Sequence, residues 1–175
     1  MMKPIVHPPL HEATQGGYPR TVARTDFTEM ACSVARTLGT VGEQWSLLIM
    51  RDAFLGVRRF EDFQRDLGIA RNILSDRLGK LVSEGVLERR RYSSRPERYE
   101  YRITRKGHDL FPVLLALQQW GDTWAWSIND APGRRIIHRE CGRETRAVTA
   151  CIHCGGELTA HSVRAEPLPE VLQGS

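Results

Sequence analysis

The residues of this chain with the clearest potential for chemistry are a histidine and three cysteines near its C-terminus. They form two half-sites of equal spacing, His138-x-x-Cys141 and Cys151-x-x-Cys154, and each half-site is followed directly by a glycine. Zn²⁺ takes four thiolate or imidazole ligands in a tetrahedron, and a two-residue gap followed by glycine forms a tight turn that aims two ligands at one ion. With a short hairpin over residues 145–149 between the halves, this spacing predicts a zinc ribbon that holds zinc (Zn) through His138, Cys141, Cys151 and Cys154.

Other interpretations of these residues stay open. His153 is a reserve ligand should His138 point away, Cys151 and Cys154 could form a redox pair, and the turn could be free of metal. We favour zinc in a structural role, because four protein ligands leave no open coordination position and no carboxylate base lies nearby in the sequence.

The bulk properties of the chain are those of an ordinary globular protein. Its 175 residues are 41% hydrophobic and 26% charged, with a formal net charge of +4. No apolar run approaches the length needed to span a bilayer, and the N-terminus lacks the apolar core of a signal peptide. We therefore expect a cytoplasmic protein whose cysteines stay reduced, which favours metal binding or thiol chemistry over structural disulfides. The expected parts are a disordered arm (1–25), a core domain (26–130), the cysteine-rich module (134–160) and a loose tail (161–175).

Within the core domain the hydrophobic period changes from helical to alternating and back. Two helices joined by a brief turn at Gly68-Ile69 are followed by a basic two-stranded hairpin, and a long helix then begins after Thr104 and is kinked at Pro112. This order predicts a mainly α fold with a small β-hairpin wing, a winged helix-turn-helix. The expected helices are Met30–Leu38, Trp45–Phe54, Phe60–Leu67, Ala70–Glu84 and Arg105–Trp126, and the hairpin runs from Val86 to Ile103 with its turn at Ser93–Glu97.

Basic residues concentrate on the hairpin. From Glu88 to Lys106 there are eight Arg or Lys residues against three acids, a local charge of +5 that exceeds the net charge of the whole chain. Such a strip is the footprint of a surface that neutralises phosphates. The helix before it buries Leu74, Leu78 and Leu81 on one face and turns Asn and Arg side chains, which suit base contacts, to the other. The candidate DNA-binding residues are Arg58, Arg59, Arg71, Asn72, Ser75, Arg77, Arg95 and Arg98, with Arg77 either contacting DNA or bracing the helix.

The stretch from Cys32 to Trp120 also resembles the HxlR family of winged helix-turn-helix transcription regulators. The matching segments are Cys32–Leu38, Trp45–Asp52, Arg58–Phe63, Asn72–Leu78, Leu81–Leu87, Tyr99–Gly107 and Pro112–Leu117. The resemblance implies a transcription regulator, repressor or activator, that binds double-stranded DNA at palindromic sites as a homodimer. It also implies that the first and last core helices pack across the two-fold axis. Ser33 stands where the family usually has proline.

Two further expectations concern the dimer and a signal. Trp120, Trp124 and Trp126 give the last helix more aromatic bulk than one small core needs, which favours an interface. Cys32 occupies the position of the cysteine that, in some members of the family, senses oxidants or electrophiles. A helix N-terminus favours thiol reactivity. The alternative is that Cys32 is a small buried residue at the start of a helix.

Other classes of function are weaker. A thiol-redox or metal-dependent enzyme would rest on cysteine spacing alone, since the chain has no phosphate-binding glycine loop and no nucleophile elbow. A winged helix and zinc ribbon that bind another protein would not need a basic wing. We therefore expect a DNA-binding regulator and no enzymatic activity.

Overall fold

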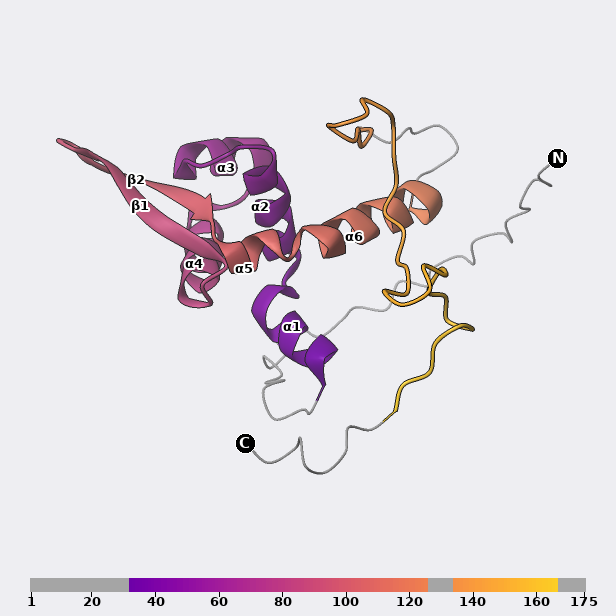
Figure 1. The fold of residues 1–175 in the computed structure, drawn as a ribbon. Helices are drawn as coiled ribbons and strands as arrows, with labels where there is room; N and C mark the ends of the chain where they lie inside the picture. The colour runs from indigo at the N-terminus through magenta and orange to yellow at the C-terminus, as the bar shows by residue number, and fades with distance from the viewer. Residues whose placement is uncertain (1–31, 126–133, 167–175) are drawn as a thin grey trace, which may run out of the picture. The chain divides into compact units, whose positions relative to one another are not determined.

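The structure is a computed structural model that describes residues 32–125 and 134–166. The predicted disordered arm, Met30, Trp126, the boundary at 131–133 and most of the predicted tail lie outside the described residues. By its contacts the chain divides into residues 1–39 and residues 40–175. The elements, shown in Figure 1, are α1 (Ser33–Val41), α2 (Gln44–Phe54), α3 (Phe60–Leu67), α4 (Arg71–Ser83), β1 (Leu87–Ser94), β2 (Glu97–Ile103), α5 (Arg105–His108) and α6 (Phe111–Trp124).

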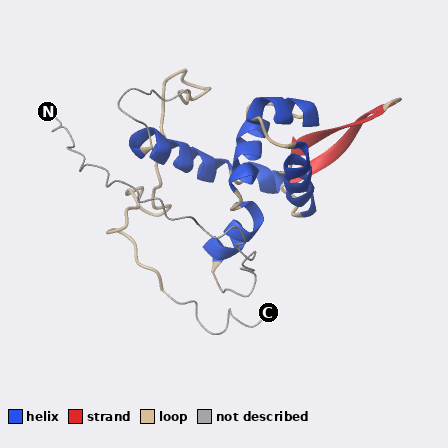
Figure 2. Ribbon diagram, turned by 180° about the vertical axis from the view of Figure 1, so that it is seen from behind, coloured by secondary structure: helices blue, strands red, loops and turns tan. Residues whose placement is uncertain are grey.

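The predicted fold class is confirmed, because three helices pack around one apolar core and a two-stranded antiparallel hairpin follows them. Figure 2 shows this hairpin extending past the helices as a wing. The core side chains come from α2, α3, α4 and the start of β1, together with Val41 at the end of α1, Ile69 and Val86, and burial of this surface is the main force that holds the helices together. Its most deeply buried large side chains are Phe63, Ile49, Met50, Leu74, Leu78, Leu81 and Leu87.

The helix-turn-helix forms as the sequence predicts. α3 ends at Gly68, which adopts the left-handed conformation (φ 60°) that glycine tolerates at a helix C-terminus. Ile69 in the turn is buried, and α4 begins one residue later than expected, after Ala70 as its N-cap residue. The turn is therefore anchored in the core while the chain reverses between the two helices.

The wing is longer than the sequence suggests. β1 and β2 pair from Leu87 with Ile103 to Ser94 with Glu97, so only Arg95 and Pro96 remain in the turn. The expected five-residue turn at Ser93–Glu97 is wrong, because Ser93 and Ser94 continue the ladder and the Ser93 hydroxyl donates to the Pro96 carbonyl oxygen at 2.9 Å.

The single long helix expected after Thr104 is also wrong. The Thr104 hydroxyl oxygen does cap a helix, accepting from the Gly107 N–H at 3.1 Å, but that helix is only α5. A break at Asp109-Leu110 follows, and Pro112 lies in the first turn of α6 instead of kinking a continuous helix. Proline is favoured there because the first backbone N–H groups of a helix have no internal partner.

Among the residues that the structure describes, no helix is long and apolar enough to cross a membrane.

Candidate nucleic-acid interface

One face of α4 is free of core contacts and carries polar side chains. Leu74, Leu78 and Leu81 are fully buried, so the opposite side of the helix faces solvent. The sequence places these leucines on one narrow stripe, and the structure confirms it. Exposed on the other side are Arg71, Asn72, Ser75, Asp76 and Gly79. This is the geometry that a helix needs to enter the major groove while its other face packs on the domain.

Ion pairs along the wing neutralise part of its basic strip, and exposed arginines remain at the tip. Each of its three acids pairs with an arginine: Glu88 with Arg90 at 3.8 Å, Glu97 with Arg91 at 3.7 Å, and Glu100 with Arg102 at 2.6 Å. Arg95 and Arg98 are exposed beside the turn, and no ion pair within the described residues involves them. The tip of the wing therefore offers cationic side chains that an anion could pair with.

The segment that precedes α3 joins the same surface. The Arg58 carbonyl oxygen accepts from the Tyr101 N–H at 2.8 Å, and Arg59 forms an antiparallel bridge with Glu100. Arg58 and Arg59 thus lie along the outer edge of β2, and both are exposed. The sequence shows only that two arginines precede a helix, whereas this backbone pairing attaches them to the wing.

Aromatic rings hold several of these arginines in place. The Arg59 guanidinium lies 5.0 Å from the centroid of the Tyr92 ring, and that of Arg71 lies 4.8 Å from the centroid of Phe60. Such cation–π contacts restrict the side chains without neutralising their charge. Phe60 and Tyr92 are supporting residues that sequence reasoning missed.

A third contact of this kind was also missed. The Arg89 guanidinium lies 3.6 Å from the centroid of the Tyr99 ring. Strand alternation was the available signal, because Arg89 and Tyr99 come from facing strands.

Arg77 differs from the other candidates. Its side chain is only 15% exposed and pairs with Glu43 at 3.2 Å and with Asp76 at 2.8 Å. Glu43 is the N-cap residue of α2, so this pair ties α4 to the start of α2. Of the two roles expected for Arg77, the geometry favours bracing the helix over contacting DNA.

The wing is fixed to the end of α4 by a compact set of hydrogen bonds. The Thr104 hydroxyl donates to the Gly85 carbonyl oxygen at 2.7 Å, and the Lys106 ammonium donates to the Glu84 carbonyl oxygen at 2.6 Å. A Cβ on Gly107 would lie against the Val86 carbonyl oxygen and 2.7 Å from Ile103 Cγ2, so this close approach requires glycine. Because these contacts leave little freedom, the exposed face of α4 and the basic wing keep a defined relation.

Tyrosines on the wing have perturbed acidity. Burial raises the pKa of Tyr101, whose ring packs against Phe63 in the core. The pKa of Tyr99 is raised mainly because its hydroxyl donates to the Glu97 carboxylate at 2.6 Å. Tyrosine ordinarily has a pKa of about 10, and both shifts are upward, so both rings are neutral near pH 7 and add no negative charge to the basic surface.

The C-terminal half-sites form two separate turns. In the first, His138 Nδ1 lies 3.3 Å from Cys141 Sγ; in the second, hydrogen bonds from the backbone N–H groups of His153 and Cys154 lower the pKa of Cys151. The hairpin expected over 145–149 is wrong, because each half-site closes on itself by its own bridge, Ile137 with Glu144 and Ala150 with Glu157. Within the described residues no group of three or more His, Cys, Asp or Glu side chains is gathered as a metal site.

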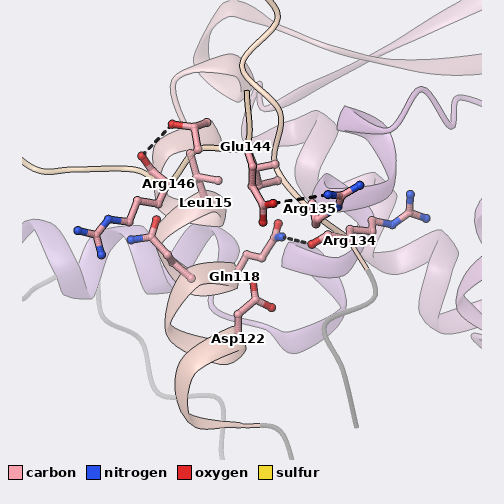
Figure 3. Close-up of a pocket in the computed structure, with 10 residues that line it drawn as sticks. Leu115, Gln118, Asp122, Arg134, Arg135, Glu144 and Arg146 are labelled. Atoms are coloured by element: carbon pink, nitrogen blue, oxygen red, sulfur yellow. Dashed lines mark hydrogen bonds and ion pairs between the residues drawn. The ribbon is translucent and has the colours of Figure 1, made fainter. Parts of the chain in front are cut away.

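The segment that carries the first turn lies against α6. The Gln119 side chain accepts from the Ala147 N–H at 2.7 Å and donates to the Ala147 carbonyl oxygen at 3.0 Å. An adjoining cleft has a volume of about 460 Å³. In it, Gln118 of α6 donates to the Arg134 carbonyl oxygen at 3.3 Å and Arg135 pairs with Glu144 at 3.6 Å (Figure 3). Sequence reasoning did not anticipate that α6 would hold this segment.

The remaining predicted residues lie outside the basic surface. Cys32 is exposed and its carbonyl oxygen accepts from the Arg36 N–H at the start of α1, so the alternative interpretation of Cys32 as a small buried residue is wrong. Trp120 and Trp124 are 63% and 54% exposed, so these two rings do not serve as core packing within the chain.

An exposed polar helix beside a basic hairpin defines a winged helix-turn-helix protein that binds DNA. The model of the HxlR-like helix-turn-helix family matches residues 40–129, about half of the chain. The chain therefore belongs to the HxlR-like family, and it is a DNA-binding transcription regulator.

Similar proteins agree with this assignment. An uncharacterized HTH-type transcriptional regulator of Mycobacterium tuberculosis is 48% identical over 137 residues, which cover 78% of this chain and 86% of the relative. The HTH-type regulator YybR of Bacillus subtilis is 30% identical over 93 residues, 53% of this chain and 74% of the relative. The crystal structure of PA1607, described as a candidate transcription factor, has a TM-score of 0.74 and 38% identity, covering 81% of this chain and 99% of that one.

Proposed function

We propose that this regulator acts as a homodimer that reads a palindromic operator, with α4 of each copy in a major groove. The observation that carries the proposal is the exposed polar face of α4, which hydrogen bonds hold beside a basic wing. Two-fold symmetric proteins of this class bind half-sites about one helical turn apart. The regulator would bind its operator in the cytoplasm, and the position of the operator relative to the promoter would decide between repression and activation.

Base reading would come from the N-terminal part of α4. Arg71, Asn72 and Ser75 are exposed there, and Asn and Arg can each make two hydrogen bonds to one base edge. The contact of Arg71 with the Phe60 ring supports a preset position for its guanidinium. Arg77, held by Glu43 and Asp76, would support the helix instead.

Phosphate binding would come from four exposed arginines. Arg95 and Arg98 at the wing tip and Arg58 and Arg59 along β2 would contact the backbone or the adjacent minor groove. These contacts contribute affinity that falls with salt and carry little sequence information.

Dimerisation would use an apolar stripe on α6. Val113, Leu117 and Trp120 are 44%, 48% and 63% exposed, and at about 100° per residue they lie on one side of the helix. Gln119, which holds the C-terminal segment, lies about 125° around the helix from the centre of this stripe, so both surfaces can be used at once. α1 has its own exposed apolar pair, Val34 and Leu38, which suits the family's use of its first helix in the interface.

Selection from a random DNA library with the purified protein tests the proposal. We expect enrichment of a palindrome whose half-site centres are about 10 base pairs apart. Asn72→Ala should relax the preference at particular base pairs, and Lys80→Ala on the same helix is the matched control, with the preference retained. Enrichment of an asymmetric sequence, or an equal loss of affinity on every sequence for Asn72→Ala, would contradict the assignment.

A second candidate function is the sensing of oxidants or electrophiles through Cys32. The observation that favours it is the exposure of this thiol at the start of α1. The solved structure of the redox regulator HypR in its oxidized form is 30% identical to this chain, with a TM-score of 0.50, and covers 53% of this chain and 96% of HypR. If the thiol is a sensor, oxidant treatment should change operator affinity in the wild type and leave Cys32→Ser unaffected.

A further inference from the structure

The two C-terminal half-sites share one backbone design. In each, the N–H of the glycine after the second ligand position donates to the carbonyl oxygen of the first, Gly142 to His138 and Gly155 to Cys151, both at 2.8 Å. Both glycines have positive φ, 67° and 71°. Each turn places its two ligand-type side chains next to each other.

The repetition extends beyond the turns. The His138 N–H donates to the Arg143 carbonyl oxygen at 2.9 Å, and the Cys151 N–H donates to the Gly156 carbonyl oxygen at 2.8 Å. The bridges from Ile137 to Glu144 and from Ala150 to Glu157 occupy matching places. The two residues between the ligand positions differ, Arg139-Glu140 in the first turn and Ile152-His153 in the second. The two turns therefore share only their ligand-type side chains and the glycine that allows the turn.

The side chains in the first turn are spaced as ligands of one ion. A Zn–S bond of about 2.3 Å and a Zn–N bond of about 2.05 Å at a tetrahedral angle place the two ligand atoms about 3.6 Å apart. His138 Nδ1 and Cys141 Sγ are 3.3 Å apart, close to this value. Both side chains are exposed, and Cys151 is half-buried.

Each turn supplies two ligands, and zinc needs four. No third ligand is gathered beside either pair within the described residues, so a complete site requires both turns. Nine residues separate Cys141 from Cys151. A loop of this length closes at a modest entropic cost, so the two turns of one chain can reach a common ion.

We propose that the C-terminal segment binds one Zn²⁺ per chain, with the two turns as half-sites that the ion brings together. Three thiolates and one imidazole complete the tetrahedron and leave no place for water, so the site is structural. On binding, the thiols of the three cysteines release their protons to solvent. Residues 145–149, tethered to Gln119 of α6 through Ala147, are the part of the chain that must rearrange. The ligands are His138, Cys141, Cys151 and Cys154.

The test uses the full-length untagged protein, purified without chelators and analysed for bound zinc. We expect close to one equivalent per chain, and Co²⁺ in place of Zn²⁺ should show the absorption bands of a tetrahedral ion with thiolate ligands. Less than half an equivalent after reconstitution with Zn²⁺, or an octahedral cobalt spectrum, would overturn the proposal.

Variants test the ligand set. Cys141→Ser and Cys151→Ser, one in each turn, should each weaken Zn²⁺ affinity at least about tenfold in competition with a chromogenic chelator. Cys32→Ser and His153→Ala are matched controls that remove a thiol or an imidazole outside the set, and both should retain the ion. Full retention by either turn variant, or loss in His153→Ala with retention in His138→Ala, would refute the assigned ligands.

Two further measurements separate zinc from its alternatives. Removal of zinc should speed trypsin cleavage after Arg146, which lies between the turns, while an unchanged rate would argue against a rearrangement there. A mass lower by two hydrogens in metal-free protein would reveal a Cys151–Cys154 disulfide in place of a zinc site. A mixture of Cys141→Ser and Cys151→Ser chains should stay deficient in zinc, and recovery of the ion on mixing would show that the turns pair between chains.

Discussion

Replacement of Arg77 distinguishes a residue that contacts DNA from one that positions the helix that does. Arg77→Ala removes a side chain that is 15% exposed and ties α4 to Glu43 at the start of α2. Asp76, its other partner, is 66% exposed and becomes hydrated when the pair is broken. We expect this change to lower stability and to leave base preference unaltered.

The magnitude follows from the environment of the guanidinium. A hydrogen bond to a charged group contributes about 1.5–3 kcal/mol, but exposed pairs contribute at most about 1 kcal/mol. Arg77 Nε is buried without a hydrogen-bond partner within the described residues, and its removal offsets part of the loss. We therefore expect a free energy of unfolding lower by about 1–2 kcal/mol, which corresponds to a melting temperature lower by roughly 5–10 °C for a domain of this size.

Thermal unfolding followed by circular dichroism gives the change in melting temperature. Operator affinity across a salt series, measured well below the melting temperature, gives the effect on DNA binding. The salt slope and the base preference should match those of the wild type. Glu43→Ala should destabilise to a similar extent, and the double variant should be less destabilised than the sum of the two single variants. An unchanged melting temperature together with lost base discrimination would show that Arg77 reads DNA and that the bracing role is wrong.

Four other changes have defined outcomes. Arg95→Ala should weaken binding to all DNA sequences alike and reduce the salt slope by about one, and an unchanged slope would remove Arg95 from the phosphate contacts. Trp120→Glu should shift the protein toward monomer in sedimentation at micromolar concentration, and an unaltered mass would place the interface elsewhere. Gly107→Ala should lower the free energy of unfolding by about 1–3 kcal/mol, because the new Cβ would meet Val86 and Ile103. Gly79→Ala is the control, since open space surrounds Gly79 and the melting temperature should not fall. Cys32→Ser should abolish any change of operator affinity on oxidant treatment, and a retained response would exclude Cys32 as the sensor.

Much of the DNA-binding unit could be read from the sequence because its signals are local. The leucine spacing that places Leu74, Leu78 and Leu81 in the core depends only on helical period, and Gly68 ends α3 because few other residues adopt its conformation. The basic strip is likewise a property of consecutive residues. The HxlR-like family, the wing and the exposed face of α4 were therefore all predictable, with errors of one or two residues at most helix and strand ends.

The features that sequence reasoning missed are those in which distant residues meet. Whether Arg77 contacts DNA or braces α4 depends on Glu43, which helical period cannot place beside it. The close approach of Gly107 in α5 to the Val86 carbonyl oxygen is likewise a contact that helical period does not predict.

The C-terminal segment shows the same division. Spacing alone identified the two pairs of ligand-type residues, because a turn with two intervening residues is a local structure. That each pair closes on its own bridge, and that Ala147 between them is held by Gln119 of α6, is visible only in the structure. Local period and turn chemistry belong to the sequence, whereas the partner that a side chain meets across the fold is settled only by tertiary structure.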